Sequence, residues 1–273
     1  MIVKDVSVEA YAPREIASLV ELGGVSKART DALTVLVLAV LAGAFISLGA
    51  LFFTVLVTGS QLGFGVTRMV GGLGFCLGLI LTVVAGAELF TGNNLLAMAW
   101  ASGRIRTREM LRNWLLAYAG NVMGCLGTVL LAWCANVAGL GGGTVRDTAI
   151  EIAQTKANLS ILEGFARGVL CNALVCLAVW LTMGGRSVTD KILAILFPIA
   201  AFVAMGFEHS IANWFLLPFG LVLDGRETIS WAGAARNLIV VTGGNIVGGT
   251  MLVAGVYWLA YLRGARASRD PMT

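Results

Sequence analysis

The sequence predicts an all-α integral membrane protein with six transmembrane helices, arranged as two inverted three-helix repeats whose second and fifth helices are broken. Hydrophobic residues make up 58% of the 273 residues and charged residues only 12%, whereas soluble domains average roughly 45–50% and 25%. Several charge-free runs exceed the roughly 20 residues that a helix needs to cross a membrane. Two similar polar motifs, 120 positions apart, each interrupt an apolar run.

Six spans account for the apolar runs. Four of them are free of charge: 32–67, in which the first span is expected at 32–57, and then 113–145, 168–185 and 237–262. The runs 69–103 and 192–223 each carry one acidic residue, Glu88 and Glu208, and each is long enough for one crossing. Because lipid offers the backbone no hydrogen bonds, spans of this length must be helices. A soluble enzyme is therefore excluded.

The lysines and arginines orient these spans. With the N-terminus inside, 13 of the 19 basic residues fall in the four inner segments, 1–31, 102–112, 183–191 and 263–273. The positive-inside rule then places both termini in the cytoplasm. The net charge of +4 follows from this bias, so no nucleic-acid partner is expected.

The topology divides the chain into five segments. They are a cytoplasmic N-terminal segment (1–31), a first three-span repeat (32–145), an outer connecting segment (146–160), a second three-span repeat (161–263) and a cytoplasmic tail (264–273). The first segment lacks the apolar core of a cleavable signal. In it, Pro13 is expected to start a short amphipathic helix that Gly23 and Gly24 close. The outer segment is expected to hold another short helix.

No metal site, cofactor or catalytic residue is expected. The five cysteines all lie in apolar spans without a CxxC motif, and the chain has a single histidine. Cysteines in this setting are small buried hydrophobic residues.

Matching motifs in the two halves indicate the repeat. Glycine, glutamate and asparagine take the same places in GAELFTGN at 86–93 and in GFEHSIAN at 206–213, and GNVMG at 120–124 corresponds to GNIVG at 244–248. Three spans are an odd number, so the second half must enter the membrane from the opposite side. In transporters built this way the substrate site lies near the midplane, where broken helices of the two halves meet. Residues 86–94 and 206–213 are therefore the candidate site.

An ionisable residue at this depth is a functional candidate because a charge in lipid is costly. Gly86, Gly92 and Gly206 permit the helices to break. Glu88 and Glu208 are interpreted as acceptors for the backbone N–H groups freed at the breaks, with proton carriage or cation binding as the alternative. His209 is the one side chain here that can give and retake a proton near neutral pH.

Neutral and apolar side chains complete the predicted pathway. Thr91, Asn172 and Asn213 can orient a small polyatomic anion or His209, and the alternative role of each is a hydrogen bond between packed helices. Dry constrictions above and below the site are expected from six large apolar residues, Phe75, Leu79, Leu89, Phe90, Val175 and Phe202.

The motifs AELFTG at 87–92 and GFEHSIAN at 206–213 resemble the signature motifs of the formate/nitrite transporter family. The resemblance covers about residues 27 to 264. LAVWL at 177–181 and GRSVTDK at 185–191 are similar to the formate channel branch, whereas a short loop between spans five and six keeps nitrite in contention. The resemblance implies an aquaporin-like fold and a homopentamer in the lipid bilayer of a prokaryotic cytoplasmic (inner) membrane, each protomer with its own pore.

The resemblance also implies roles for individual residues. His209 would be the central pore histidine and Thr91 its partner, with the six apolar residues as constrictions and Lys156 as a vestibule lysine that attracts anions. The expected function is a channel or proton-linked transporter for small monovalent anions, first formate, with nitrite or hydrosulfide as alternatives. Burying a charge costs more than burying a neutral acid, so protonation near His209 would let the acid cross.

Two other classes remain as rivals. A membrane enzyme using Ser210 and His209 is disfavoured, because no motif that would orient a base toward a nucleophile is visible. A proton-coupled cation carrier built on Glu88 and Glu208 is the stronger rival.

Overall fold

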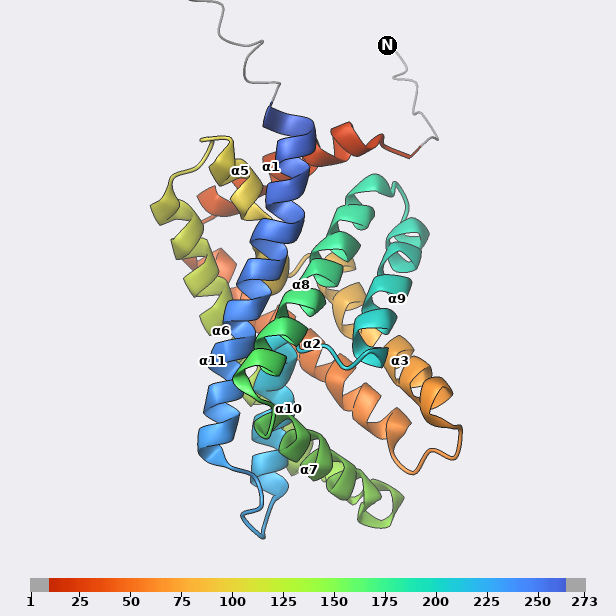
Figure 1. Ribbon diagram of the computed structural model, residues 1–273. Coiled ribbons are helices and arrows are strands. Elements are labelled where there is room, and N and C mark those ends of the chain that lie inside the picture. Colours follow the sequence, from red (N-terminus) through yellow and green to blue (C-terminus); the bar gives the residue numbers. More distant parts are fainter. Residues whose placement is uncertain (1–9, 264–273) are drawn as a thin grey trace, which may run out of the picture.

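The computed structural model describes residues 10–263, and all regular secondary structure in that range is helical (Figure 1). The predicted cytoplasmic tail, 264–273, and the start of the N-terminal segment, 1–9, lie outside the described residues. The helices are α1 (Pro13–Arg29), α2 (Ala32–Val57), α3 (Phe64–Val84), α4 (Phe90–Asn93), α5 (Leu96–Ala101), α6 (Thr107–Cys134), η1 (Val137–Gly143), α7 (Thr144–Ala157), α8 (Ile161–Gly184), α9 (Val188–Ala204), α10 (Ser210–Leu223), α11 (Trp231–Val247), η2 (Gly248–Gly255) and η3 (Trp258–Leu262).

Five helices within residues 10–263 are long and apolar enough to cross a membrane. They are α2, α3, α6, α8 and the continuous helix Trp231–Leu262, which comprises α11, η2 and η3. The run 192–223, expected to cross as the fifth span, consists of the two shorter helices α9 and α10, which residues 205–209 separate. The predicted all-α architecture is confirmed, and α2 has the bounds expected of the first span.

The first helix is longer than the sequence predicted. Gly23 and Gly24 were expected to end it, but α1 continues through both to Arg29. A side chain at Gly24 would come within 3.2 Å of the Ala99 side chain, so glycine here allows α1 to pack closely on α5. Close packing of this kind offsets the low helix propensity of glycine.

Glycines also set the contacts between the long helices. A side chain at Gly124 would collide with the backbone carbonyl of Val40, where α6 crosses α2, and one at Gly248 would collide with the carbonyl of Val169, where η2 crosses α8. Small residues at such crossings let helices approach closely in a membrane. The GNVMG and GNIVG motifs therefore hold two equivalent helix pairs together.

The remaining elements close the two ends of the bundle. Figure 1 shows α1 and α5 at one end and α7 at the other. α7 occupies the polar segment that was expected to hold a short helix. α10 packs on α6 and α7, and α3 packs on α9. The two non-helical segments, 85–89 and 205–209, lie between these ends.

Candidate functional site

A left-handed glycine starts the turn at each non-helical segment. Gly86 has φ 82° and Gly206 has φ 72°, a region that side-chain-bearing residues rarely adopt. Both glycines therefore lie where the chain leaves helical geometry, and their role in the breaks stays a prediction. Gly92 differs: it lies inside α4 without a positive φ, and a Cβ there would make only an ordinary contact, 3.6 Å from Val179. The break therefore does not depend on Gly92.

Each glutamate is bound by one lysine and by the asparagine five positions after it, and Glu208 also accepts from Asn237 Nδ2 at 3.3 Å. Glu88 accepts from Lys27 Nζ at 2.9 Å and from Asn93 Nδ2 at 2.7 Å. In the equivalent arrangement, Glu208 accepts from Lys156 Nζ at 2.8 Å and from Asn213 Nδ2 at 2.7 Å. These hydrogen bonds to carboxylates are of the strong, charge-assisted kind. Lys27, at the end of α1, and Lys156, at the end of α7, hold the two segments from opposite ends of the bundle.

The backbone groups at the breaks are satisfied by two other asparagines. Asn121 accepts from the Phe90 N–H at 2.9 Å and donates to the Glu88 carbonyl at 2.9 Å. Asn245 accepts from the Ser210 N–H at 2.8 Å and donates to the Glu208 carbonyl at 2.9 Å. A third bond ties each asparagine to the neighbouring helix, at the carbonyls of Ala39 and Gly168.

These contacts correct the role expected of the glutamates. Among residues 10–263, no backbone N–H donates to the carboxylate of Glu88 or Glu208, so neither glutamate serves as the acceptor at its break. Asn121 and Asn245 do this instead. The signal for them was present in the sequence, since each is the asparagine of a repeated GN motif.

At the centre, the two broken segments meet through His209 and Thr91. His209 Nε2 lies 3.0 Å from Thr91 Oγ1, and the Ala212 N–H donates to His209 Nδ1 at 3.0 Å. The imidazole is 3% exposed and Thr91 is fully buried. His209 is thus both the cap of α10 and the partner of α4, which are the two helices that resume after the breaks.

Two cavities approach this pair from opposite ends. Cavity 1, of about 250 Å³, is lined by Lys27, Glu88 and the end of α3 at 79–83. Cavity 2, of about 360 Å³, is lined by Lys156, Glu208, His209 and the earlier part of α3 at 67–75. Because α3 is a continuous helix, the cavities follow one another along it, and they change over between residues 75 and 79.

Large apolar side chains lie at this changeover. Leu79 and Leu89 line cavity 1, while Phe75 and Phe202 line cavity 2. The Phe75 and Phe202 rings contact each other, with centroids 5.5 Å apart, and the centroid of Phe202 lies 6.0 Å from that of His209. All four side chains are buried. The structure therefore brings four of the six predicted constriction residues to the cavity walls.

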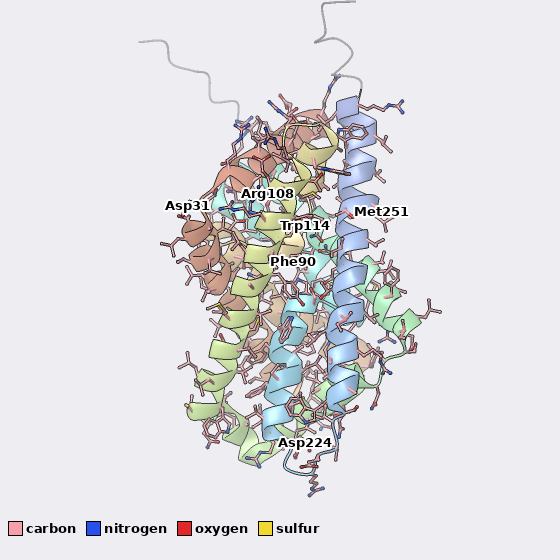
Figure 2. The ribbon with its side chains drawn as sticks, turned by 90° about the vertical axis from the view of Figure 1, so that its left-hand side faces the viewer. Asp31, Phe90, Arg108, Trp114, Asp224 and Met251 are labelled. Atoms are coloured by element: carbon pink, nitrogen blue, oxygen red, sulfur yellow. The ribbon has the colours of Figure 1, made fainter. Side chains whose placement is uncertain are left out.

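The other two constriction residues line neither cavity. Val175 is buried within α8. Phe90 packs edge-on against two residues of α6, Tyr118, with ring centroids 4.9 Å apart, and Trp114. Figure 2 shows Phe90 and Trp114 close to one another. The sequence pattern did not distinguish these packing roles from a role at a cavity wall.

The polar residues predicted for the pathway also differ in whether they line a cavity. Asn172 is fully buried and donates to the carbonyls of Thr91 and Asn245 and to the side chain of Asn94, so it joins helices rather than facing a cavity. Asn213 lines cavity 2, and its Oδ1 is a buried acceptor without a partner among the described residues. Lys156 lines the same cavity with its Nζ bound to Glu208.

The described residues contain no cluster of side chains that could hold a metal ion. The membrane-spanning helices and a buried histidine–threonine pair between two opposed cavities define the class of membrane channels and transporters. The similarity of this chain to known proteins agrees with that class. The family model for formate/nitrite transporters matches residues 14–259, and this chain belongs to the formate/nitrite transporter family.

Several relatives support the assignment. The formate channel FocA of Escherichia coli K12 is 40% identical over 269 residues, which cover 92% of this chain and 94% of the relative. A probable formate transporter of Methanothermobacter thermautotrophicus is 39% identical over 250 residues, covering 84% and 89%. A solved pentameric formate channel with formate bound is 40% identical with a TM-score of 0.79, covering 85% of this chain and 98% of that one.

Proposed function

We propose that this chain is a channel for small monovalent anions, with formate as its principal substrate, and that the anion passes from one cavity to the other beside Thr91 and His209. The observation that carries this is the arrangement of two cavities on either side of one buried Thr–His pair, with apolar side chains at the changeover. The similarity to formate channels supports formate as the substrate.

The hydrogen bonds of His209 indicate how the pair meets an anion. Nδ1 accepts from the Ala212 N–H, so the proton of a neutral imidazole resides on Nε2 and points to Thr91 Oγ1. The Thr91 hydroxyl then accepts this bond, and its own proton has no acceptor among residues 10–263. Both groups can therefore donate to an anion that enters between the cavities.

Proton transfer follows from the same geometry. A second proton on His209 would sit at Nδ1, where it displaces the Ala212 N–H and costs the cap of α10. An anion beside Nε2 compensates for that cost, so His209 becomes an imidazolium mainly while an anion is present. Transfer of the Nε2 proton leaves a neutral acid, which crosses the apolar wall more readily than the ion. The ring is then neutral with its proton on Nδ1, and it returns to the resting tautomer by losing this proton and taking one up at Nε2, which restores the bond from the Ala212 N–H.

We further propose that the fold consists of two inverted repeats with six spans. The matched contacts of Glu88 with Glu208, of Lys27 with Lys156 and of Asn121 with Asn245 support this. In this arrangement α9 and α10 form the fifth span. The basic inner segments support cytoplasmic termini, which puts cavity 1 on the inner side and cavity 2 on the outer side. Similarity to a pentameric channel supports a homopentamer.

The contacts disfavour the rival cation carrier, because each glutamate is already paired with a lysine at 2.9 Å or less. The test is uptake into proteoliposomes of formate, nitrite, hydrosulfide, acetate and chloride, compared across pH. Formate should enter fastest, and faster as the pH falls. Preference for nitrite or hydrosulfide would change the substrate within the family, and no anion flux above that of empty liposomes would refute the proposal.

A further inference from the structure

The charges at the two cavities are unequal. Cavity 1 has one cation and one carboxylate in its lining, Lys27 and Glu88, and these two are paired. Cavity 2 has three cations, Arg68, Lys156 and Arg167, against two carboxylates, Glu151 and Glu208. The lining of cavity 2 therefore carries a net positive charge, whereas that of cavity 1 is balanced.

The excess charge of cavity 2 resides on its two arginines. Lys156 is neutralised by Glu208 at 2.8 Å. Arg68 donates to two backbone carbonyls at the end of α9, those of Val203 and Ala204, and forms no ion pair within residues 10–263.

Arg167 has one carboxylate neighbour, Glu163, at a loose 3.8 Å, and that carboxylate is 54% exposed. Its guanidinium makes no hydrogen bond to any described residue. Exposed pairs of this kind contribute little. Glu151, the other carboxylate of cavity 2, pairs with neither arginine.

Both arginines lie outward of the central pair by similar distances. Arg68 precedes Phe75 by seven residues on α3, which corresponds to about 10 Å of helix. Arg167 precedes Asn172, which bonds the Thr91 carbonyl, by five residues on α8, or about 7.5 Å. An anion that enters cavity 2 therefore reaches these guanidinium groups before it reaches His209.

The other end of the molecule has no such charges at the equivalent positions. The Glu208 N–H donates to the Arg167 carbonyl, and in the matching contact the Glu88 N–H donates to the carbonyl of Leu38. The two glutamates are 120 positions apart, and the same offset makes Val188 the position in the second repeat that is equivalent to Arg68. Where cavity 2 has arginine, the cavity 1 end has leucine and valine.

We propose that Arg68 and Arg167 form a loading site for small oxyanions at the mouth of cavity 2, and that cavity 1 has no counterpart. A guanidinium presents paired N–H groups that suit the two oxygens of a carboxylate or of nitrite. The site raises the local concentration of the anion and so lowers the external concentration that half-saturates transport from that side. This inference rests on the proposed anion channel and makes it asymmetric.

The test compares right-side-out and inside-out membrane vesicles that contain the wild-type chain, Arg167→Leu, Arg68→Gln or Arg146→Gln. Leucine is the residue at the equivalent position of the other end. Arg146 is the matched control, since it is an exposed arginine of α7, at the cavity 2 end, that lines neither cavity 1 nor cavity 2. Initial formate influx is measured against formate concentration at low ionic strength and again in about 1 M potassium gluconate.

Arg167→Leu should raise the half-saturating formate concentration by about three- to tenfold in right-side-out vesicles, with an unchanged maximal rate. In inside-out vesicles it should stay within about 1.5-fold of wild type. The difference should nearly vanish in high salt, where the Debye length falls to about 3 Å. Arg68→Gln should act in the same direction, and Arg146→Gln should match wild type throughout.

The loading site would be overturned, and the channel left intact, if the wild type takes up formate and both arginine variants behave like it. In that case the half-saturating formate concentrations of Arg167→Leu and Arg68→Gln would lie within 1.5-fold of wild type in both orientations. Equal effects in both orientations would also overturn it. Absence of formate influx in the wild type would instead overturn the proposed function itself.

Discussion

Replacing Lys156 with methionine tests how strongly the ion pairs hold the broken segments. Methionine keeps the length of the side chain but removes the charge that lies 2.8 Å from Glu208. Glu208 is 5% exposed, so its carboxylate would remain buried with only asparagine amides as partners. Breaking a buried pair on one side costs about 3–5 kcal/mol of unfolding free energy.

The equivalent pair at the other end provides the matched comparison. Lys27 and Glu88 are a similar 2.9 Å apart, but their side chains are 34% and 12% exposed, and Lys27 Nζ also donates to Asn93 Oδ1 at 2.9 Å. Water can then reach the carboxylate that remains, so Lys27→Met should cost only about 1–2 kcal/mol. The double variant Lys156→Met with Glu208→Gln removes the unpaired charge and should recover most of the stability, to within about 1–2 kcal/mol of wild type.

Unfolding is followed by tryptophan fluorescence while the purified protein in mild detergent is titrated with sodium dodecyl sulfate. The coupling energy from the four-variant cycle should exceed about 1.5 kcal/mol for Lys156 and Glu208. Equal losses for Lys27→Met and Lys156→Met would refute the argument from burial. A double variant no more stable than Lys156→Met would show that the pair acts through packing instead of charge.

Two further predictions concern the centre and the helix packing. Thr91→Val keeps the shape of the side chain but removes the hydroxyl that lies 3.0 Å from His209, so formate flux in proteoliposomes should fall at least about tenfold. Thr91→Ser keeps the hydroxyl and should retain most of the flux. Equal flux in the two variants would exclude a role for the hydroxyl. Gly124→Ala places a methyl group against the Val40 carbonyl and should reduce the yield of folded protein on size-exclusion chromatography. Gly127→Ala lies on the same helix with open space around it and should leave the yield unchanged. A normal yield of both variants would argue against close packing of α2 and α6.

The sequence predicted an all-α membrane fold because a membrane makes the hydrophobicity of each segment decisive. The first span was expected at 32–57, within the charge-free run 32–67, and α2 has these bounds. The two isolated glutamates lie next to the breaks at Gly86 and Gly206. The prediction from sequence was wrong at Gly23 and Gly24, where the low helix propensity of glycine suggested that the first helix ends. Close packing of Gly24 on α5 outweighs that propensity, and such packing is a property of the tertiary structure.

The candidate site was predicted in its residues more than in its contacts. His209 and Thr91 lie 3.0 Å apart, although 118 positions separate them in the sequence. The sequence did not predict the partners of the glutamates. It suggested that each carboxylate accepts from a backbone N–H freed at the break, whereas in the structure Asn121 accepts from the Phe90 N–H. Lys27 was not considered, since its contact with Glu88 depends on the unbroken course of α1.

The central claim is that formate crosses next to His209 and takes a proton from it. The most direct measurement records formate uptake and internal pH together, in proteoliposomes with wild type and with His209→Asn. Wild type should acidify the interior or lose external protons in step with formate entry. His209→Asn keeps a hydrogen-bonding side chain without a titratable proton, so it should pass formate as an anion with little proton movement. Unchanged proton-coupled uptake in His209→Asn would contradict the account.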